Sequence, residues 1–201
     1  MDKLKKWKKG RTIFVQSMGD LFGDWVDEET IRVVMKACAE NKQHRYIFLT
    51  KSPHNLPLMS YIYTGVFSTH DDNMWFGTSV AVQQDFKQRL KGNHFINISG
   101  NTFLSVEPIQ GEIDLTRINI GDVILNLLEG EAFTLLAKNK IKPVKWVIVG
   151  AMTGKEAKNY PVKREWVEKI VEDCRECNIP VFLKDNLAEV WKEALIQQFP
   201  W

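Results

Sequence analysis

The sequence has few cysteines and no long apolar run, and both features narrow the class of protein. Its 201 residues include three cysteines, too few for a disulfide framework in a chain of this length. No apolar stretch reaches the roughly 18 residues that a membrane-spanning helix requires, and no signal-peptide pattern is present. We therefore expect a protein of the reducing cytoplasm that has no membrane partner.

An excess of charge of either sign is missing as well. Lys and Arg together number 27 and Asp and Glu 25, so the formal net charge is +2. This balance provides no electrostatic argument for binding nucleic acid, which we do not expect as a partner. Residues 1–10 are locally basic. They are expected to form a solvated, partly disordered tail, the alternative being contact with phosphates.

The spacing of typical metal ligands is also lacking. The four histidines are scattered, without an HxxxH or HExxH pattern. Cys174 and Cys177 form a CxxC pair at the end of a predicted helix, and no second pair accompanies them. One core cysteine and one helix-end cysteine explain this pair more simply than a zinc site does. We predict no metal ligand in this chain.

What the sequence does contain is an alternation of short apolar runs with stretches of helical periodicity. Short runs rich in Val, Ile and Phe are typical of strands that are buried on both faces of a parallel sheet. Six such runs occupy residues 12–18, 46–50, 74–80, 103–106, 146–149 and 180–183. We predict one α/β domain over residues 1–201, a partial TIM-like barrel of about six parallel strands with flanking helices. An open, partly wound sheet is the alternative.

Helical patterns fill most of the connections between these runs. Asp24 or Asp27 is expected to cap the first helix, which runs to about residue 41, and Ser52-Pro53 opens another. Further helices are predicted over residues 82–90, 164–177 and 188–199. Residues 111–143 are expected to form an irregular insertion or a hairpin, with a short helix near 132–139. Because the first run begins close to residue 1, we also expect an upstream segment that covers this sheet edge.

Polar residues that follow the apolar runs are the candidate site residues, because parallel sheets bind ligands at the carboxyl ends of their strands. Glu107 is the leading candidate for a general base, the alternative being a carboxylate that accepts loop N–H groups. Asp20 and Lys51 follow the first two runs and are further catalytic candidates. The structural alternative is an ion pair of Lys51 with Asp20 or Glu107.

Three other positions are candidates for contacting a cofactor. Ser79 ends the third run and provides a hydroxyl, and Gly150 and Thr153 belong to the loop after the fifth run, whose backbone N–H groups can cradle a ligand. This loop lacks the spacing of a nucleotide-binding phosphate loop, so ATP hydrolysis is not expected. Lys184 and Asp185, after the sixth run, are predicted to pair.

Five segments together resemble a known family. They are residues 12–26, 48–53, 75–80, 103–108 and 146–150. In this order, and over about residues 11–187, the chain resembles the phage-associated family called phage gene product thirty-seven/sixty-eight. That resemblance implies a barrel like that of radical S-adenosylmethionine enzymes, with an N-terminal C-x3-C-x2-C segment that holds a [4Fe–4S] cluster. It also implies a separate protein partner, the three-Cys-motif partner.

The chain departs from the family pattern in two places. It has no C-x3-C-x2-C segment, and Met152 stands where relatives often have glutamate. The resemblance therefore implies S-adenosylmethionine and a [4Fe–4S] cluster for a longer form only, and no cofactor for this chain. The first functional hypothesis is the barrel portion of a radical S-adenosylmethionine-like enzyme that lacks its cluster segment. The second is a non-catalytic binding module of phage or mobile-element origin.

Overall fold

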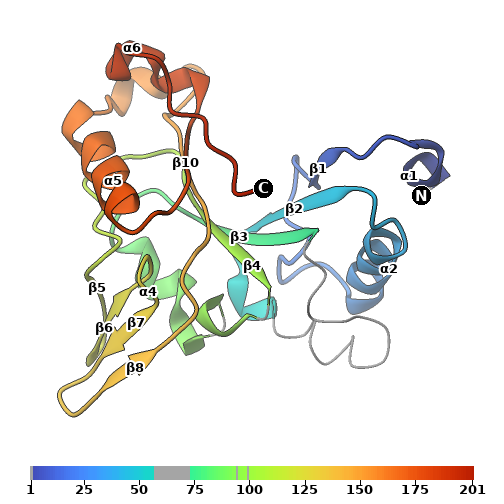
Figure 1. The fold of residues 1–201 in the computed structure, drawn as a ribbon, viewed down its shortest axis with the longest axis horizontal. Coiled ribbons are helices and arrows are strands. Elements are labelled where there is room, and N and C mark those ends of the chain that lie inside the picture. The colour runs from blue at the N-terminus through green and yellow to red at the C-terminus, as the bar shows by residue number, and fades with distance from the viewer. Residues whose placement is uncertain (1, 57–72, 94, 99) are drawn as a thin grey trace.

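The computed structural model describes residues 2–56, 73–93, 95–98 and 100–201, and its centre is a twisted sheet of six parallel strands (Figure 1). The strand order is β1-β2-β3-β4-β9-β10. Their bounds are β1 Thr12–Val15, β2 Arg45–Thr50, β3 Met74–Val80, β4 Asn101–Val106, β9 Val147–Val149 and β10 Val181–Leu183. This half-barrel confirms the predicted partial TIM-like α/β fold with flanking helices.

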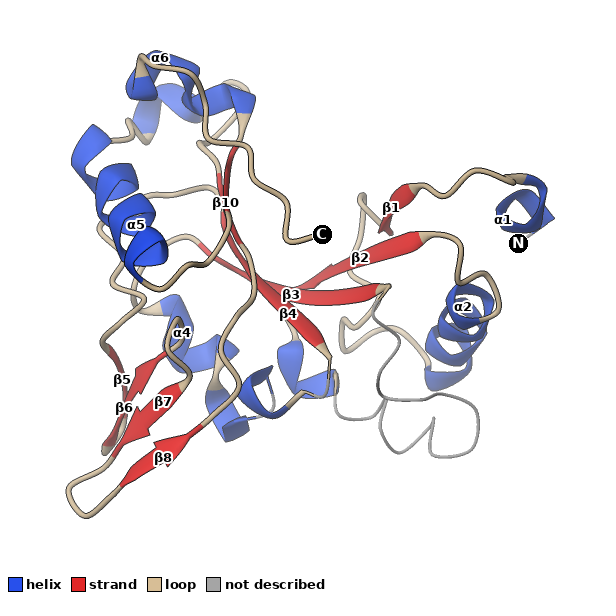
Figure 2. Cartoon of the chain, in the orientation of Figure 1, coloured by secondary structure: helices blue, strands red, loops and turns tan. Residues whose placement is uncertain are grey.

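Helices cover one face of this sheet, as the colours of Figure 2 make plain. The α-helices are α1 Asp2–Lys6, α2 Glu28–Ala39, α4 Asp85–Arg89, α5 Arg164–Glu176 and α6 Ala188–Trp191. Short 3-10 turns cover Pro53–Asn55, Lys91–Asn93, Phe95–Asn97, Ala157–Asn159 and Asp185–Leu187. The helix predicted to open at Ser52-Pro53 begins as the first of these turns, and its continuation over residues 57–72 lies outside the described residues. No helix in the described part is both long and apolar enough to cross a membrane.

Asp27 caps the first long helix. Its Oδ1 accepts a hydrogen bond of 2.8 Å from the backbone N–H of Thr30, which satisfies one of the free donors at the start of α2. Asp24, the alternative cap, instead accepts hydrogen bonds from His54 Nε2 and Asn55 Nδ2, each at 2.8 Å. Asp24 therefore links the β1–α2 loop to the residues after β2.

Residues 111–143 form a second sheet, of four antiparallel strands. These are β5 Ile118–Ile120, β6 Val123–Asn126, β7 Glu131–Phe133 and β8 Lys138–Lys140. The helix expected near 132–139 is wrong, because Ala132 pairs with Asn139 across a tight hairpin. Ile118 and Leu125 belong to the core cluster that also contains side chains of α2, α4 and α5, so the insertion extends the main core.

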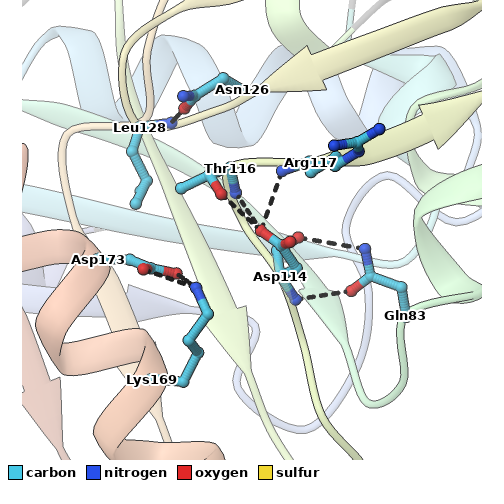
Figure 3. A network of polar contacts seen from close by, with 8 residues as sticks. All are labelled: Gln83, Asp114, Thr116, Arg117, Asn126, Leu128, Lys169 and Asp173. Atoms are coloured by element: carbon cyan, nitrogen blue, oxygen red, sulfur yellow. Dashed lines mark hydrogen bonds and ion pairs between the residues drawn. The ribbon is translucent and has the colours of Figure 1, made fainter.

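A polar network joins this insertion to the barrel (Figure 3). The Gln83 side chain accepts a hydrogen bond from the backbone N–H of Asp114 and donates one to its carbonyl oxygen. Oδ1 of Asp114 accepts from the backbone N–H groups of Thr116 and Arg117. Burial alone would raise the pKa of Asp114, but the hydrogen bonds from Thr116 and the backbone outweigh it and hold that pKa below its ordinary value. The carboxylate therefore serves as a structural anchor.

Hairpin β7–β8 is predicted to lose stability in acid. Glu131 accepts hydrogen bonds from Lys138 and Lys140, and these hold its pKa below the ordinary value of 4.5. A carboxylate of lowered pKa stabilises the fold above its unfolded pKa, and this contribution is lost as the pH falls through the folded value. We expect amide protection factors in β7 and β8 to decrease below pH 4.5, relative to those of the six-stranded sheet. In Glu131→Gln this difference should vanish, and a persistent acid loss in that variant would contradict the assignment.

The last helix is shorter than predicted. It ends at Trp191, because Lys192 adopts a left-handed conformation with φ 64°. The chain then runs extended beside β10, where Leu183 donates its N–H to the carbonyl oxygen of Ile196 and Gln198 donates to that of Val181. This segment occupies the outer edge of β10, which would otherwise expose unpaired backbone groups.

The second face of the sheet, here called the inner face, carries an aromatic cluster. Ile47, Trp75, Phe103 and Trp146 are buried there, separate from the helix-covered core. Trp201 from the C-terminal segment packs against Trp75 and Trp146, with ring centroids 5.4 and 5.3 Å away. Aromatic side chains of the chain's own C-terminus thus cover the amino-terminal half of the inner face.

Candidate functional site

Several polar side chains lie at the strand ends on the inner face. Residues in register across parallel strands share a face, and Ser79, Ser105 and Ile148 are in register on β3, β4 and β9. Two positions further along, Glu107 follows β4 and Gly150 follows β9. The polar residues therefore gather at the strand ends, where ligand sites of parallel sheets occur.

Glu107 and Lys184 converge at this edge. Nζ of Lys184 donates to Oε1 of Glu107 at 2.6 Å, although the residues lie 77 positions apart in the sequence. The Glu107 side chain is 26% exposed and that of Lys184 more so, so the pair is open to solvent on one side. Because one side of the pair faces solvent, a charged ligand can reach both side chains.

Gly150 makes room for that pair. A Cβ atom at position 150 would lie 2.8 Å from Oε1 of Glu107 and 3.0 Å from Cδ of Lys184. A larger residue at position 150 would push the Glu107 carboxylate or the Lys184 side chain away from its present place. The structure thus brings together three residues of the strand ends, of which Glu107 and Gly150 are sequence-predicted candidates. Lys184 was predicted to pair with Asp185, which accepts from Gln197 Nε2 instead.

Asn186 is a residue that the sequence analysis missed. Its Oδ1 accepts from the N–H of Ala151 at 3.0 Å, and its Nδ2 donates to the Ala151 carbonyl at 2.9 Å. This pair of bonds fixes the loop after β9 against the segment after β10. The sequence does offer one signal for Asn186: an amide residue lies two positions after Lys184, near the end of the sixth apolar run. Thr153 lies further along the same loop and is exposed.

Asp20 has a structural role in this arrangement. Its Oδ2 accepts from Thr50 Oγ1 at 3.0 Å and from the backbone N–H of Lys51 at 2.7 Å, while Oδ1 accepts from the N–H of Phe22. These bonds join the loop after β1 to the end of β2. Within the described residues the exposed Lys51 side chain forms no ion pair, so neither expected pairing of Lys51, with Asp20 or with Glu107, is present.

Ser79 and its neighbour Thr78 differ in what their hydroxyls do. Oγ1 of Thr78 donates to the carbonyl oxygen of Thr50 at 2.8 Å and is buried between strands. The Ser79 hydroxyl points to the opposite face of the sheet and has no hydrogen-bond partner among the described residues. Ser79 is itself buried, with a relative exposure of 6%, and its role as a cofactor contact stays a prediction.

The chain's own cysteines do not fit an iron–sulfur cluster. Cys38 and Cys174 are buried on α2 and α5, and burial raises the pKa of each thiol to about 12. Cluster ligands are thiolates, whereas these two groups stay protonated at neutral pH. In the described part of the chain, no three His, Cys, Asp or Glu residues are arranged to hold a metal ion.

Comparison with known proteins identifies a family for the chain. No curated protein and no solved structure matches the chain. A family model described as Protein of unknown function (DUF5131) matches residues 1–195. This match spans the half-barrel, the inserted sheet and the strand-end residues Glu107, Gly150 and Lys184. The chain belongs to this family, Protein of unknown function (DUF5131).

Proposed function

We propose that the chain is the barrel portion of an enzyme that binds a small polar ligand at the carboxyl ends of β3, β4, β9 and β10. The observation that carries this proposal is the convergence of Glu107 and Lys184 above Gly150, on the inner face of the half-barrel. Ser79 lies on the same face, and its hydroxyl has no hydrogen-bond partner among the described residues. A carboxylate, an ammonium and a hydroxyl on one face of the sheet can orient a ligand and move a proton.

Glu107 is the acid–base residue in this proposal, and Lys184 has two roles. In the free protein the Lys184 ammonium holds the Glu107 carboxylate in place at 2.6 Å. When a ligand offers an amine or hydroxyl to Glu107, Lys184 is left to face negative charge on the same ligand. The pair therefore favours a ligand that carries an amine or hydroxyl next to an anionic group.

S-adenosylmethionine is the first ligand to test, because the resemblance to radical S-adenosylmethionine-like enzymes supports it and its aminoacyl end has both charges. Ser79, Gly150 and Thr153 are the proposed contacts on the cofactor side. Because Cys38 and Cys174 are unsuited to a cluster, its cysteines would come from a longer form of the protein. The three-Cys-motif partner is a separate protein that this proposal includes as a binding partner. The phage origin of the family is part of this proposal and rests on the same resemblance.

Calorimetric titration of the purified chain with S-adenosylmethionine tests the site. We expect Glu107→Gln to weaken binding by roughly tenfold or more, because a hydrogen bond to a charged group is worth about 1.5–3 kcal/mol. Glu189→Gln, an exposed carboxylate on α6, is the matched control and should leave the affinity unchanged. Binding that is equally strong in both variants would show that the ligand lies elsewhere.

A non-catalytic binding module is the second candidate. Exposed apolar side chains favour it: Phe14 lies on edge strand β1, and Met18 and Trp25 lie in the loop after it. Side chains of this kind often anchor protein partners. Thermal denaturation with S-adenosylmethionine, methionine and nucleosides separates the two candidates. A midpoint that none of these compounds shifts would favour the binding module.

A further inference from the structure

The segment that precedes β1 carries exposed positive charge. Its exposed cations are Lys5, Lys6, Lys8, Lys9 and Arg11. Within the described residues, none of these four lysines forms an ion pair. The formal net charge of the whole chain is only +2, so this positive charge is a local feature of one end of the sheet. Unpaired charge of one sign that gathers in one place attracts partners of the opposite sign.

The backbone of this segment is held against the barrel by His44, which is buried directly before β2. Nδ1 of the imidazole accepts from the backbone N–H of Arg11 at 3.2 Å, so Nε2 carries the proton and donates to the carbonyl oxygen of Leu4 at 2.9 Å. The ring of Trp7 packs edge-on against the same imidazole, with ring centroids 5.9 Å apart. A segment that is already ordered loses little conformational entropy when a partner binds.

The apolar side chains of the segment pack against the barrel and leave the lysines outside. Leu4 packs against the main core, and Trp7 packs against His44. Helix α1 has only five residues. A helix that lies in a lipid surface needs an apolar face directed away from its own protein, and this segment does not provide one. The charges therefore fit a polyanion in water better than a membrane.

Two arginines beside these lysines each lie over an indole ring. The guanidinium carbon of Arg11 is 4.5 Å from the centre of the Trp7 ring. That of Arg45 is 4.1 Å from the centre of the Trp201 ring. The N–H of Arg45 donates to the carbonyl oxygen of Arg11 at 2.8 Å, so both pairs lie at the amino-terminal end of β1 and β2. Aromatic rings and guanidinium planes are the surfaces on which unpaired bases stack.

We propose that residues 5–11, here called the basic segment, bind single-stranded nucleic acid. The lysines contact the backbone phosphates, and the pair of Arg11 and Trp7 provides a platform on which a base stacks. Because phosphates and stacking are common to all sequences, we expect binding with little sequence preference. The basic segment lies before the amino-terminal ends of the strands, whereas Glu107 and Lys184 follow the carboxyl ends of β4 and β10. This proposal is therefore independent of the strand-end site.

Fluorescence anisotropy of a labelled oligothymidine, titrated with the full chain at several NaCl concentrations, tests the proposal. The double variant Lys8→Gln, Lys9→Gln should bind roughly tenfold more weakly at low salt, and its slope of log affinity against log salt should be smaller by about 1.4, or about 0.7 for each lost phosphate contact. Lys155→Gln, Lys158→Gln removes two exposed lysines from the loop after β9 and is the matched control. It should bind like the wild type.

A variant of Trp7 separates stacking from charge. Trp7→Leu should weaken binding by roughly fivefold or more and leave the salt slope unchanged, whereas Trp7→Phe keeps a ring and should retain most of the affinity. Circular dichroism checks the fold of each variant. Equal losses in the two double lysine variants, or no binding of the oligothymidine to the wild-type chain at low salt, would overturn the proposal. Binding to phosphatidylserine vesicles in preference to the oligothymidine would also overturn it and would identify a lipid surface as the partner.

Discussion

Replacing Trp146 with alanine should lower the free energy of unfolding by about 3–5 kcal/mol, the usual cost of removing a buried aromatic side chain. Trp146 is buried at the centre of the inner face, where its ring packs against those of Phe103, Phe182 and Trp201. Its Nε1 also donates to the carbonyl oxygen of Gln198 at 3.0 Å. The substitution therefore leaves a cavity and releases the C-terminal segment together.

Chemical denaturation followed by fluorescence or circular dichroism measures this loss. Trp25→Ala is the matched control, because Trp25 is 77% exposed and its removal should change stability by less than about 0.5 kcal/mol. A second readout follows from the Gln198 bond, since release of the segment should increase proteolysis near the C-terminus in Trp146→Ala only. Equal stabilities of the two variants would show that the aromatic cluster contributes little to the fold.

Gly77→Ala is the second substitution with a large expected effect. An added Cβ would lie only 2.3 Å from Cζ of Phe103, which is itself fully buried on the neighbouring strand. Neither the backbone of central strand β3 nor the enclosed ring has room to move. We expect a loss of about 1–3 kcal/mol, the usual cost of overpacking a core.

A double-mutant cycle isolates this steric cause. Phe103→Leu shortens the side chain that an alanine at position 77 would meet, so the combined variant should lose less stability than the sum of the two single variants. Gly111→Ala is the control, since a Cβ there has no neighbour closer than Val82 Cγ1 at 3.9 Å. Strict additivity in the cycle would argue against a clash between positions 77 and 103.

The sequence predicts two residues of the candidate site individually, but it does not predict which residues contact one another there. Glu107 and Gly150 stand out in the sequence because each follows an apolar run. Lys184 becomes their neighbour only because β10 lies next to β9 in the sheet. Asp20 is, like Glu107, a carboxylate that follows an apolar run in the sequence. In the structure, however, its carboxylate accepts three hydrogen bonds, from Phe22, Thr50 and Lys51.

The local sequence determined the strands of the six-stranded sheet and the long helices, and the tertiary structure decided the rest. Apolar runs and helical periodicity are local properties, so they predict β3 over Met74–Val80 and α5 over Arg164–Glu176 almost to the residue. Residues 188–199 also have a helical pattern, but the chain leaves the helix after Trp191 and lies along β10. Along β10 this segment hydrogen-bonds with backbone groups at the edge of the sheet, and its aromatic side chains pack on the inner face. Both contacts depend on residues far away in the sequence, so a local pattern cannot predict them.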